Sequence, residues 1–430
     1  MNRNRRALLT GLGGLSAAAA FRNLEAQVAP ASAPGALAAN ARNAVPGFPR
    51  RADFAIEEGY TYISGAFTHP MPIAAAEAYR DAVNRRATIG APAGASRSPA
   101  PPRTARADPK TAFAALINAK PSEISYVPNT STGENLVVEC LNIGKSDGNV
   151  VTDALHFEGA LVHLMELQKQ GLDLRVVMPR EGRIDMKDLE RVVDRKTKLV
   201  EVSWVSMYNG FQHDLKAVCD LAHAHGAYVY ADIIQGVGAV PLDVRASGVD
   251  FAACATYKWL MGDFGLGFFY VREALLGRVI QRPHWSYRSA SDTDIHLSPF
   301  DPESPKPVTW TPKTDASGYF ELGTVASSVA AALAVSLPYI QRLGVDNIQR
   351  YRQPMLERLQ EEMPRLGFTP ATPLDSTSPI VTFASRDTRA AARKLDAARV
   401  AVRVAPYWIR IAPSVYNDMR DVERLLNALS

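Results

Sequence analysis

The sequence has few cysteines, no metal-site spacing and no long hydrophobic run. Its 430 residues include three cysteines, Cys140, Cys219 and Cys254. Each lies in an apolar or helix-like stretch, which indicates small core residues rather than a disulfide framework. No group of His, Cys, Asp or Glu residues has the spacing of metal ligands. The apolar run at residues 11–21 is too short to cross a bilayer core of about 30 Å as a helix, so we expect no metal and no membrane span in the mature chain.

Net charge is also small over most of the chain. The formal net charge is +4 at pH 7, but four arginines against one glutamate precede residue 27, so the remainder is close to neutral. The basic excess therefore does not indicate nucleic-acid binding. With 47% hydrophobic residues, the chain is long enough for one large domain and a smaller one.

The N-terminus has the pattern of an export signal. Arg5 and Arg6 stand just before the apolar, small-residue run at 11–21, and this arrangement resembles a twin-arginine signal peptide. We expect a signal at 1–26, cleaved after Ala20 or Ala26, and a linker rich in Ala, Pro, Gly and Asn at 27–51. The resemblance implies export of the folded protein by the twin-arginine machinery to the periplasm.

From residue 124 onward, short apolar runs alternate with amphipathic segments. The expected strands are 124–127, 150–152, 174–177, 199–205, 227–231 and 251–255, and the expected helices between them are 132–143, 158–170, 186–193 and 215–225. Such alternation predicts an α/β fold with a mainly parallel sheet flanked by helices, and ligand sites at the carboxyl ends of its strands. We place this large domain at 52–325, including an N-terminal segment of the small domain.

The C-terminal part has a different pattern. It carries long helices first and short strands later, with expected helices at 329–343, 346–363 and 419–429 and expected strands at 380–384, 400–404 and 409–412. We therefore place a smaller α+β domain at 326–430.

Two of the expected strands end on residues that carry chemistry. The strand at 227–231 is followed by Asp232 and Gln235, and the strand at 251–255 is followed by Thr256, Tyr257 and Lys258. A lysine among apolar and aromatic neighbours is costly to bury in its charged form, so its pKa falls and its amine becomes nucleophilic. Taken singly, Asp232 could be a turn residue and Lys258 a surface lysine.

A third motif lies at the junction of an expected strand and helix. Residues 127–135 read Val-Pro-Asn-Thr-Ser-Thr-Gly-Glu-Asn, with Ser131 and Thr132 at the expected start of the helix. Hydroxyl groups and unpaired N–H groups at a helix N-terminus suit a phosphate dianion.

Together these pieces resemble the class V aminotransferase family of fold-type-I enzymes that depend on pyridoxal 5'-phosphate (PLP). This family includes cysteine desulfurases, kynureninase and isopenicillin N epimerase. The resemblance implies that Lys258 forms an imine with PLP, that Asp232 pairs with the pyridinium nitrogen, and that Gln235 bonds the phenolic oxygen. It also implies that Thr256 and Tyr257 help to hold the phosphate.

The resemblance extends to four further segments. Ser131 and Thr132 match the phosphate cup, and His156, with Phe157 as the alternative, matches the ring that stacks on the cofactor. In the segment Phe-Glu-Leu-Gly-Thr at 320–324, Thr324 matches a threonine that reaches the phosphate of the other subunit, which implies a homodimer. Arg410 matches the arginine that binds the substrate carboxylate through a bidentate fork.

The chain also departs from the family pattern. Cysteine desulfurases use a cysteine between the imine lysine and the carboxylate-binding arginine, and no cysteine follows Cys254 here. Formation of a persulfide on the protein is therefore excluded. Tyr319 stands where relatives often have arginine. The role of Arg97, Arg103 and Arg106, in a loop rich in proline and alanine, stays open.

The resemblance implies an enzyme that transforms the amine of a small-molecule or peptide-borne amino acid. We expect transamination, with epimerisation and carbon–sulfur lysis without a catalytic cysteine as alternatives. An exported binding protein on an inactive PLP fold is the remaining hypothesis, and the presence of Asp232, Lys258, Gln235 and Arg410 argues against it.

Overall fold

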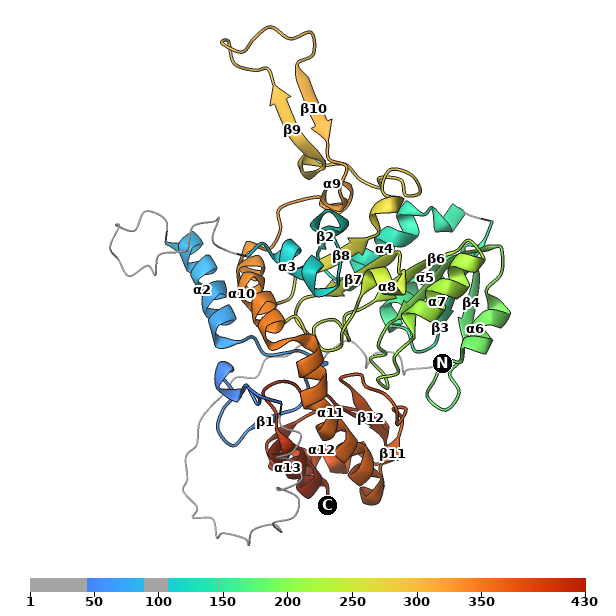
Figure 1. Cartoon of the computed structure of the whole chain (residues 1–430), viewed down its shortest axis with the longest axis vertical. Coiled ribbons are helices and arrows are strands. Elements are labelled where there is room, and N and C mark those ends of the chain that lie inside the picture. Colours follow the sequence, from blue (N-terminus) through green and yellow to red (C-terminus); the bar gives the residue numbers. More distant parts are fainter. Residues whose placement is uncertain (1–44, 89–106, 146) are drawn as a thin grey trace, which may run out of the picture. The chain divides into compact units, whose positions relative to one another are not determined.

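The structure is a computed structural model, and it describes residues 45–88, 107–145 and 147–430. From Val45 onward the chain forms one compact unit (Figure 1). The expected signal at 1–26, most of the linker and the loop arginines Arg97, Arg103 and Arg106 lie outside the described residues. The division of the folded chain at residue 326 stays a prediction.

A seven-stranded sheet forms the centre of this unit. Its order is β2–β8–β7–β6–β5–β3–β4. The strands are β2 Ile124–Val127, β3 Asn149–Asp153, β4 Asp173–Val177, β5 Thr197–Ser203, β6 Tyr228–Asp232, β7 Phe251–Ala255 and β8 Gly267–Val271. Only β8 runs antiparallel to its neighbours β2 and β7. The predicted α/β fold with a mainly parallel sheet is thus confirmed.

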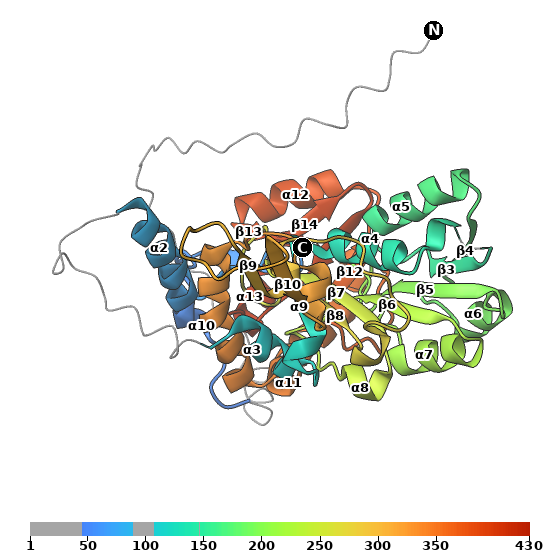
Figure 2. The same cartoon turned by 90° about the horizontal axis from the view of Figure 1, so that it is seen from above.

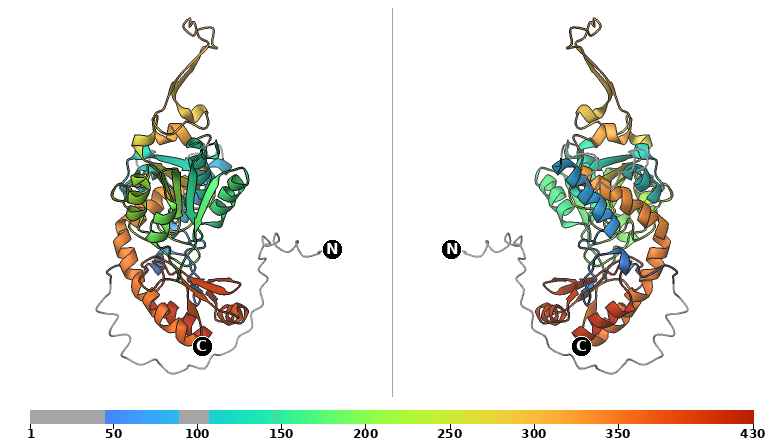
Figure 3. Two further views of the ribbon diagram at one scale, coloured as in Figure 1. Left: turned by 90° about the vertical axis from the view of Figure 1, so that its right-hand side faces the viewer. Right: turned by 90° about the vertical axis from the view of Figure 1, so that its left-hand side faces the viewer.

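Helices cover both faces of this sheet (Figure 3). Leu199 and Tyr230 point to the face that packs against α4 Thr130–Cys140 and α5 Glu158–Lys169. Val200 and Val229 alternate with them and point to the other face. The helices on that other face include α6 Met186–Val192 and α7 Leu215–Ala224. Burial on both faces is the reason why these strands read as continuous apolar runs.

A second sheet lies in the C-terminal part of the chain. Its order is β11–β12–β15–β14, and its strand pairs are antiparallel. The strands are β11 Thr369–Pro370, β12 Val381–Ala384, β14 Arg403–Ala405 and β15 Trp408–Ile411, and the helices of this region are α11 Val345–Glu362, α12 Thr388–Ala397 and α13 Met419–Leu429. The N-terminal strand β1 Thr61–Tyr62 joins this region by pairing in parallel with β13 Val400–Ala401.

The remaining elements connect or extend these two sheets. α10 Ser327–Leu343 packs against α2 Ile73–Ala87 and α3 Pro109–Leu116. The short helices are α8 Val244–Ser247 and α9 Ala316–Phe320. An exposed hairpin of β9 Ala290–Ile295 and β10 Val308–Pro312 extends away from the central sheet (Figure 1) and is seen end-on in Figure 2. The strand–helix alternation did not predict β8, because β8 follows β7 through a loop without a crossover helix.

Within the described residues, no single helix has the length and apolar composition of a membrane span. Only the bent pair of residues 327–343 and 345–366 meets those criteria, and the two helices do so jointly.

Candidate active site

Four parallel strands of the central sheet end at one edge on polar or small residues. β3 ends at Asp153, β5 at Ser203, β6 at Asp232 and β7 at Ala255. Ser203 and Asp232 are paired in register on neighbouring strands. Because carboxyl ends of parallel strands meet along one edge, these side chains gather there. Lys258 follows β7 by three residues and belongs to the same edge.

Lys258 is buried, and its amine lies 5.6 Å from the centroid of the Tyr257 ring. Burial lowers the pKa of Lys258 to about 8; the charge of Asp232 opposes this effect, and the charge of Arg410 adds to it. A substantial fraction of the amine is therefore neutral and nucleophilic near pH 7 to 8.

Asp232 is the acidic group of this edge. The side chain is buried, and its Oδ1 accepts a hydrogen bond of 3.0 Å from the amide of Ile234. Burial raises the pKa of Asp232 to about 6, while the Ile234 amide and the Lys258 charge oppose that rise. Each of the two groups changes the pKa of the other, so the structure brings the predicted amine and the predicted carboxylate together. A buried carboxylate of this kind is stabilised by a cationic N–H group beside it.

The predicted phosphate motif forms the first turn of α4. Asn129 is the N-cap, and its Oδ1 accepts hydrogen bonds from the amide of Thr132 at 2.9 Å and from its hydroxyl at 3.1 Å. Ser131 and Thr132 lie in this turn, where helical N–H groups have no partner inside the helix.

A glycine lets this helix approach the sheet. A Cβ atom added at Gly133 would lie 2.6 Å from the Cβ of Ala253 on β7. The hydroxyl of Thr130 also accepts a hydrogen bond of 2.9 Å from the amide of Ala255. These contacts fix the start of α4 beside the end of β7, and therefore beside the loop that carries Lys258.

His156, rather than Phe157, is the ring that lies at the strand ends. Its Nδ1 is 2.8 Å from the Ser203 hydroxyl, and its Nε2 is buried without a partner among the described residues. Burial lowers the pKa of His156 to about 4, so the ring is neutral at pH 7. The Phe157 ring instead turns back toward Gly159 on α5.

The pair of Asp153 and His213 supports this turn, and sequence analysis missed it. Asp153 Oδ2 lies 3.0 Å from His213 Nε2, and both side chains are buried. The other oxygen of Asp153 accepts the amide of Leu155 at 2.8 Å. No local pattern could indicate His213, because it meets Asp153 only through the pairing of distant loops.

The segment after β1 is a second feature that sequence analysis missed. Gln235 Nε2 donates to the carbonyl of Ala66 at 3.1 Å, and its Oε1 is buried without a partner among the described residues. The amide of His69 donates to the carbonyl of Tyr257 at 3.0 Å. Gly65 was the one feature of the sequence that could have indicated this close approach. An added Cβ atom at that position would lie 3.2 Å from the Trp259 ring.

The two residues before Lys258 have different environments. The Thr256 hydroxyl lies 2.7 Å from the carbonyl of Asp263 and 3.0 Å from that of Leu266. A hydroxyl has one hydrogen, so Thr256 holds the following loop in this geometry and has no donor left for a phosphate. The half-buried Tyr257 ring stacks on Phe264 with a centroid distance of 4.3 Å.

Arg410 comes from the second sheet and faces the same edge. It is buried on β15, and its Nη1 donates to the carbonyl of Met207 at 2.7 Å. Burial and, to a smaller extent, the charge of Arg403 together lower the pKa of Arg410 to about 10. No carboxylate of the described residues forms an ion pair with Arg410.

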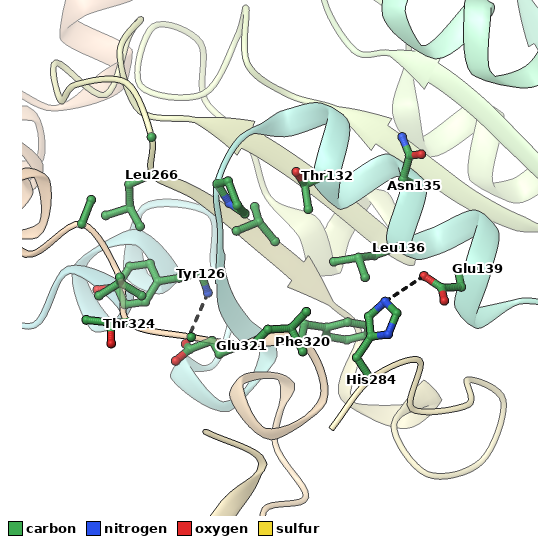
Figure 4. A pocket seen from close by; sticks show the side chains of 17 residues that line it. Tyr126, Thr132, Asn135, Leu136, Glu139, Leu266, His284, Phe320, Glu321 and Thr324 are labelled. Atoms are coloured by element: carbon green, nitrogen blue, oxygen red, sulfur yellow. Dashed lines mark hydrogen bonds and ion pairs between the residues drawn. The ribbon is translucent and has the colours of Figure 1, made fainter. Parts of the chain in front are cut away.

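Thr324 lines a pocket of about 480 Å³ together with Thr132 (Figure 4). Its hydroxyl lies 2.9 Å from that of Tyr287 in the same chain. The neighbouring Glu321 is buried and pairs with Lys110 at 2.9 Å and with Arg288 at 2.6 Å. These ion pairs hold the segment that carries Thr324 against α3 and the base of the hairpin.

The three cysteines cannot act as nucleophiles. All of them are buried, and none is disulfide-bonded. Burial raises the pKa of Cys140 and of Cys219 to about 12, and it also raises the pKa of Cys254. A thiolate is therefore not accessible near neutral pH. Within the part of the chain that the structure describes, no cluster of His, Cys, Asp and Glu could hold a metal ion.

This fold is that of the fold-type-I PLP-dependent enzymes. A cysteine desulfurase from Thermococcus onnurineus NA1 has a similar structure, with a TM-score of 0.73 and 24% sequence identity over 88% of this chain and 96% of that one. The cystine C–S lyase C-DES, one structure of which has glycine covalently linked to the PLP cofactor, superimposes with a TM-score of 0.72 and 21% identity over 89% and 99% of the two chains. These two likenesses show the fold.

Sequence comparison assigns the protein to one family within this fold. Residues 103–425 match the aminotransferase class-V family, and the chain belongs to that family. A probable cysteine desulfurase of Methanothermobacter thermautotrophicus is 30% identical over 72% of this chain and 74% of its own length. The protein is therefore an enzyme that depends on PLP.

The edge of the sheet fits this cofactor. Lys258 offers a buried amine with a lowered pKa, and Asp232 offers a buried carboxylate for a protonated ring nitrogen. The first turn of α4 offers N–H groups for a phosphate. The unpartnered Nε2 of His156 and Oε1 of Gln235 are polar atoms that a bound ligand could satisfy.

Proposed function

We propose that the protein is a carbon–sulfur lyase that acts on an amino acid with sulfur at Cβ, without a thiol of its own. The observation that carries the proposal is a buried, easily deprotonated Lys258 beside Asp232 and Arg410, in a chain whose three cysteines are all buried. Matched relatives named as cysteine desulfurases, and the structural neighbour named as a cystine C–S lyase, support cleavage at sulfur.

Each residue would have a separate task. PLP, when bound, supplies an aldehyde for Lys258 and a conjugated ring that accepts the electron pair released at the substrate Cα. Arg410 binds the substrate carboxylate, and Asp232 holds a proton on the ring nitrogen. Lys258 would take the substrate Cα proton at its Nζ. The Cβ–S bond then breaks, sulfur leaves with the electron pair, and water converts the remaining fragment into pyruvate and ammonium.

The neutral His156 completes this arrangement. Its ring packs at the strand ends without adding a charge beside Asp232, because burial keeps the ring unprotonated. The segment at 64–70 closes the site on the other side, since the Ala66 carbonyl holds Gln235 and the Tyr257 carbonyl holds His69.

The test is product analysis with the PLP-loaded enzyme. We expect S-methyl-L-cysteine or L-cystine to give pyruvate together with a thiol or a persulfide. A keto acid that retains its sulfur, formed without pyruvate, would show a transaminase instead. A change of configuration at Cα, without formation of pyruvate or of a keto acid, would show an epimerase.

The matched variant for this test is Lys258→Ala. We expect it to lose the absorbance band at ~410–430 nm that borohydride removes in the wild type, and to lose about 10²–10⁴-fold in rate. Retention of that band in Lys258→Ala would contradict the assignment of Lys258.

We also propose that the enzyme is exported by the twin-arginine machinery to the periplasm and works as a homodimer. The Arg5–Arg6 pattern supports export. The pocket beside Thr132 and Thr324 and the exposed side chains of Leu297 and Phe300 on the hairpin support a second copy, since large exposed apolar groups commonly mark protein interfaces.

A further inference from the structure

Two arginines stand directly opposite each other at the candidate active site. Arg403 on β14 pairs in register with Arg410 on β15. Directly opposed residues of antiparallel strands project to the same face, with Cβ atoms about 4.5–5.5 Å apart. Arg410 is on the side of Lys258 and Tyr257: its charge lowers the pKa of Lys258, and Tyr257 raises the pKa of Arg410. Arg403 therefore lies on the active-site face of the second sheet.

Arg403 stands farther out than Arg410. Its side chain is exposed, and its guanidinium carbon lies 5.1 Å from the centroid of the Phe67 ring, which is itself 50% exposed. Phe67 follows Ala66, whose carbonyl accepts from Gln235. The two arginines therefore form a line from the exposed rim to the buried interior of the site.

Neither arginine has a carboxylate partner among the ion pairs of the described residues. By contrast, the nearby Arg399 pairs with Glu57 at 2.9 Å. Like charges directly opposite each other on a sheet are unfavourable, and the charge of Arg403 is the second cause of the lowered pKa of Arg410. A ligand with two negative groups would offset both charges at once.

We propose that Arg403 binds a second anionic group of the substrate, so that the site takes a dicarboxylic amino acid with its α-carboxylate on Arg410. This inference rests on the proposed function and specifies its substrate class: a cysteine thioether whose side chain ends in a carboxylate. Guanidinium groups on adjacent strands match a short dianion, and each can form a bidentate pair with one carboxylate.

The test uses two probes that differ in charge and hardly in shape, S-carboxymethyl-L-cysteine and its amide, S-carbamoylmethyl-L-cysteine. Binding to the PLP-loaded enzyme is followed by the change in cofactor absorbance. We expect the wild type to bind the acid at least about tenfold more tightly than the amide, which corresponds to one good ion pair. Arg403→Gln should abolish that preference, and Arg403→Lys should keep part of it.

Two further variants serve as controls. Arg393→Gln removes an exposed arginine of α12 and should leave the preference unchanged. Arg410→Gln should weaken both probes alike. For any probe that is turned over, Arg403→Gln should raise KM for the acid and leave kcat within about twofold, since a residue that only binds substrate acts on KM.

A second arm does not need the cofactor. Calorimetry on the cofactor-free protein compares glutarate with butyrate, and we expect Arg403→Gln, but not Arg393→Gln, to remove the preference for glutarate. Equal affinity of the wild type for acid and amide, or an unchanged preference in a folded Arg403→Gln, would overturn the inference and leave the lyase proposal standing. If neither amino-acid probe changes the absorbance while S-methyl-L-cysteine or L-cystine still gives pyruvate, the inference is overturned and the lyase proposal stands. If no sulfur amino acid gives pyruvate, the proposed function fails, and the glutarate arm still reports on Arg403.

Discussion

Lys258 shows how burial and neighbouring charges together prepare a reactive group. The amine lies in an apolar and aromatic environment, which lowers its pKa to about 8. Asp232 keeps the pKa from falling further, and Arg410 adds to the decrease. The three residues come from β6, from the loop after β7 and from β15, so the reactivity of one side chain depends on both sheets.

This balance of charges predicts the pH dependence of cofactor loading. When PLP is added to the cofactor-free protein, the initial rate of covalent attachment should rise through a midpoint near pH 8, because only the neutral amine reacts. An unperturbed lysine has a pKa of about 10.4. Asp232→Asn should shift the midpoint to lower pH, and Arg410→Gln should shift it to higher pH. Stopped-flow absorbance gives the rates, and a wild-type midpoint near pH 10 would contradict the assignment.

At the scale of elements, the junction of α4 and β7 decides where a phosphate could bind. Gly133 allows the helix to contact Ala253, and Thr130 accepts the amide of Ala255. The helix start and the loop that carries Lys258 are thereby fixed relative to each other. A larger residue at 133 would separate them.

Gly133→Ala tests this junction. Alanine favours helices over glycine by about 1 kcal/mol, but the new Cβ would lie 2.6 Å from Ala253, and such overpacking costs about 1–3 kcal/mol. We expect a net loss of stability in denaturant unfolding and a weaker affinity for PLP. The double variant Gly133→Ala/Ala253→Gly removes the close contact and should recover part of both. If Gly133→Ala were more stable than the wild type and bound PLP as tightly, the close contact between α4 and β7 would not be needed for cofactor binding.

At the scale of the whole molecule, the candidate active site is built from parts of the chain that are far apart in sequence. The segment at 64–70, the central sheet and Arg410 meet at one edge.

The export proposal predicts the location of the loaded enzyme. Wild type should appear in the periplasmic fraction with its cofactor absorbance. Arg5→Lys together with Arg6→Lys should keep it in the cytoplasm, because lysine cannot reproduce the planar fork of arginine. Fractionation with a cytoplasmic marker enzyme measures the distribution. Unchanged periplasmic recovery of the double variant would count against the twin-arginine route.

The sequence by itself determined where the predicted strands of the central sheet lie, to within two residues at their carboxyl ends. Asp232 ends one apolar strand and Lys258 follows another, both strands are predicted from period and composition, and the α/β fold follows from the same alternation. Ser131 and Thr132 lie in the predicted first turn of α4 because Asn129 is a local cap. These features depend on neighbours within a few residues, so a local pattern is sufficient to find them.

Only the tertiary structure decided which distant groups complete the site. Ala66 meets Gln235, Ser203 contacts the His156 ring, and Arg403 is opposite Arg410 through strand register. The hydroxyl of Thr256 is likewise directed to backbone carbonyls of a later loop. The physical reason is that hydrophobic periodicity specifies which face of an element is buried, whereas the partner of each polar atom depends on how separate segments pack together.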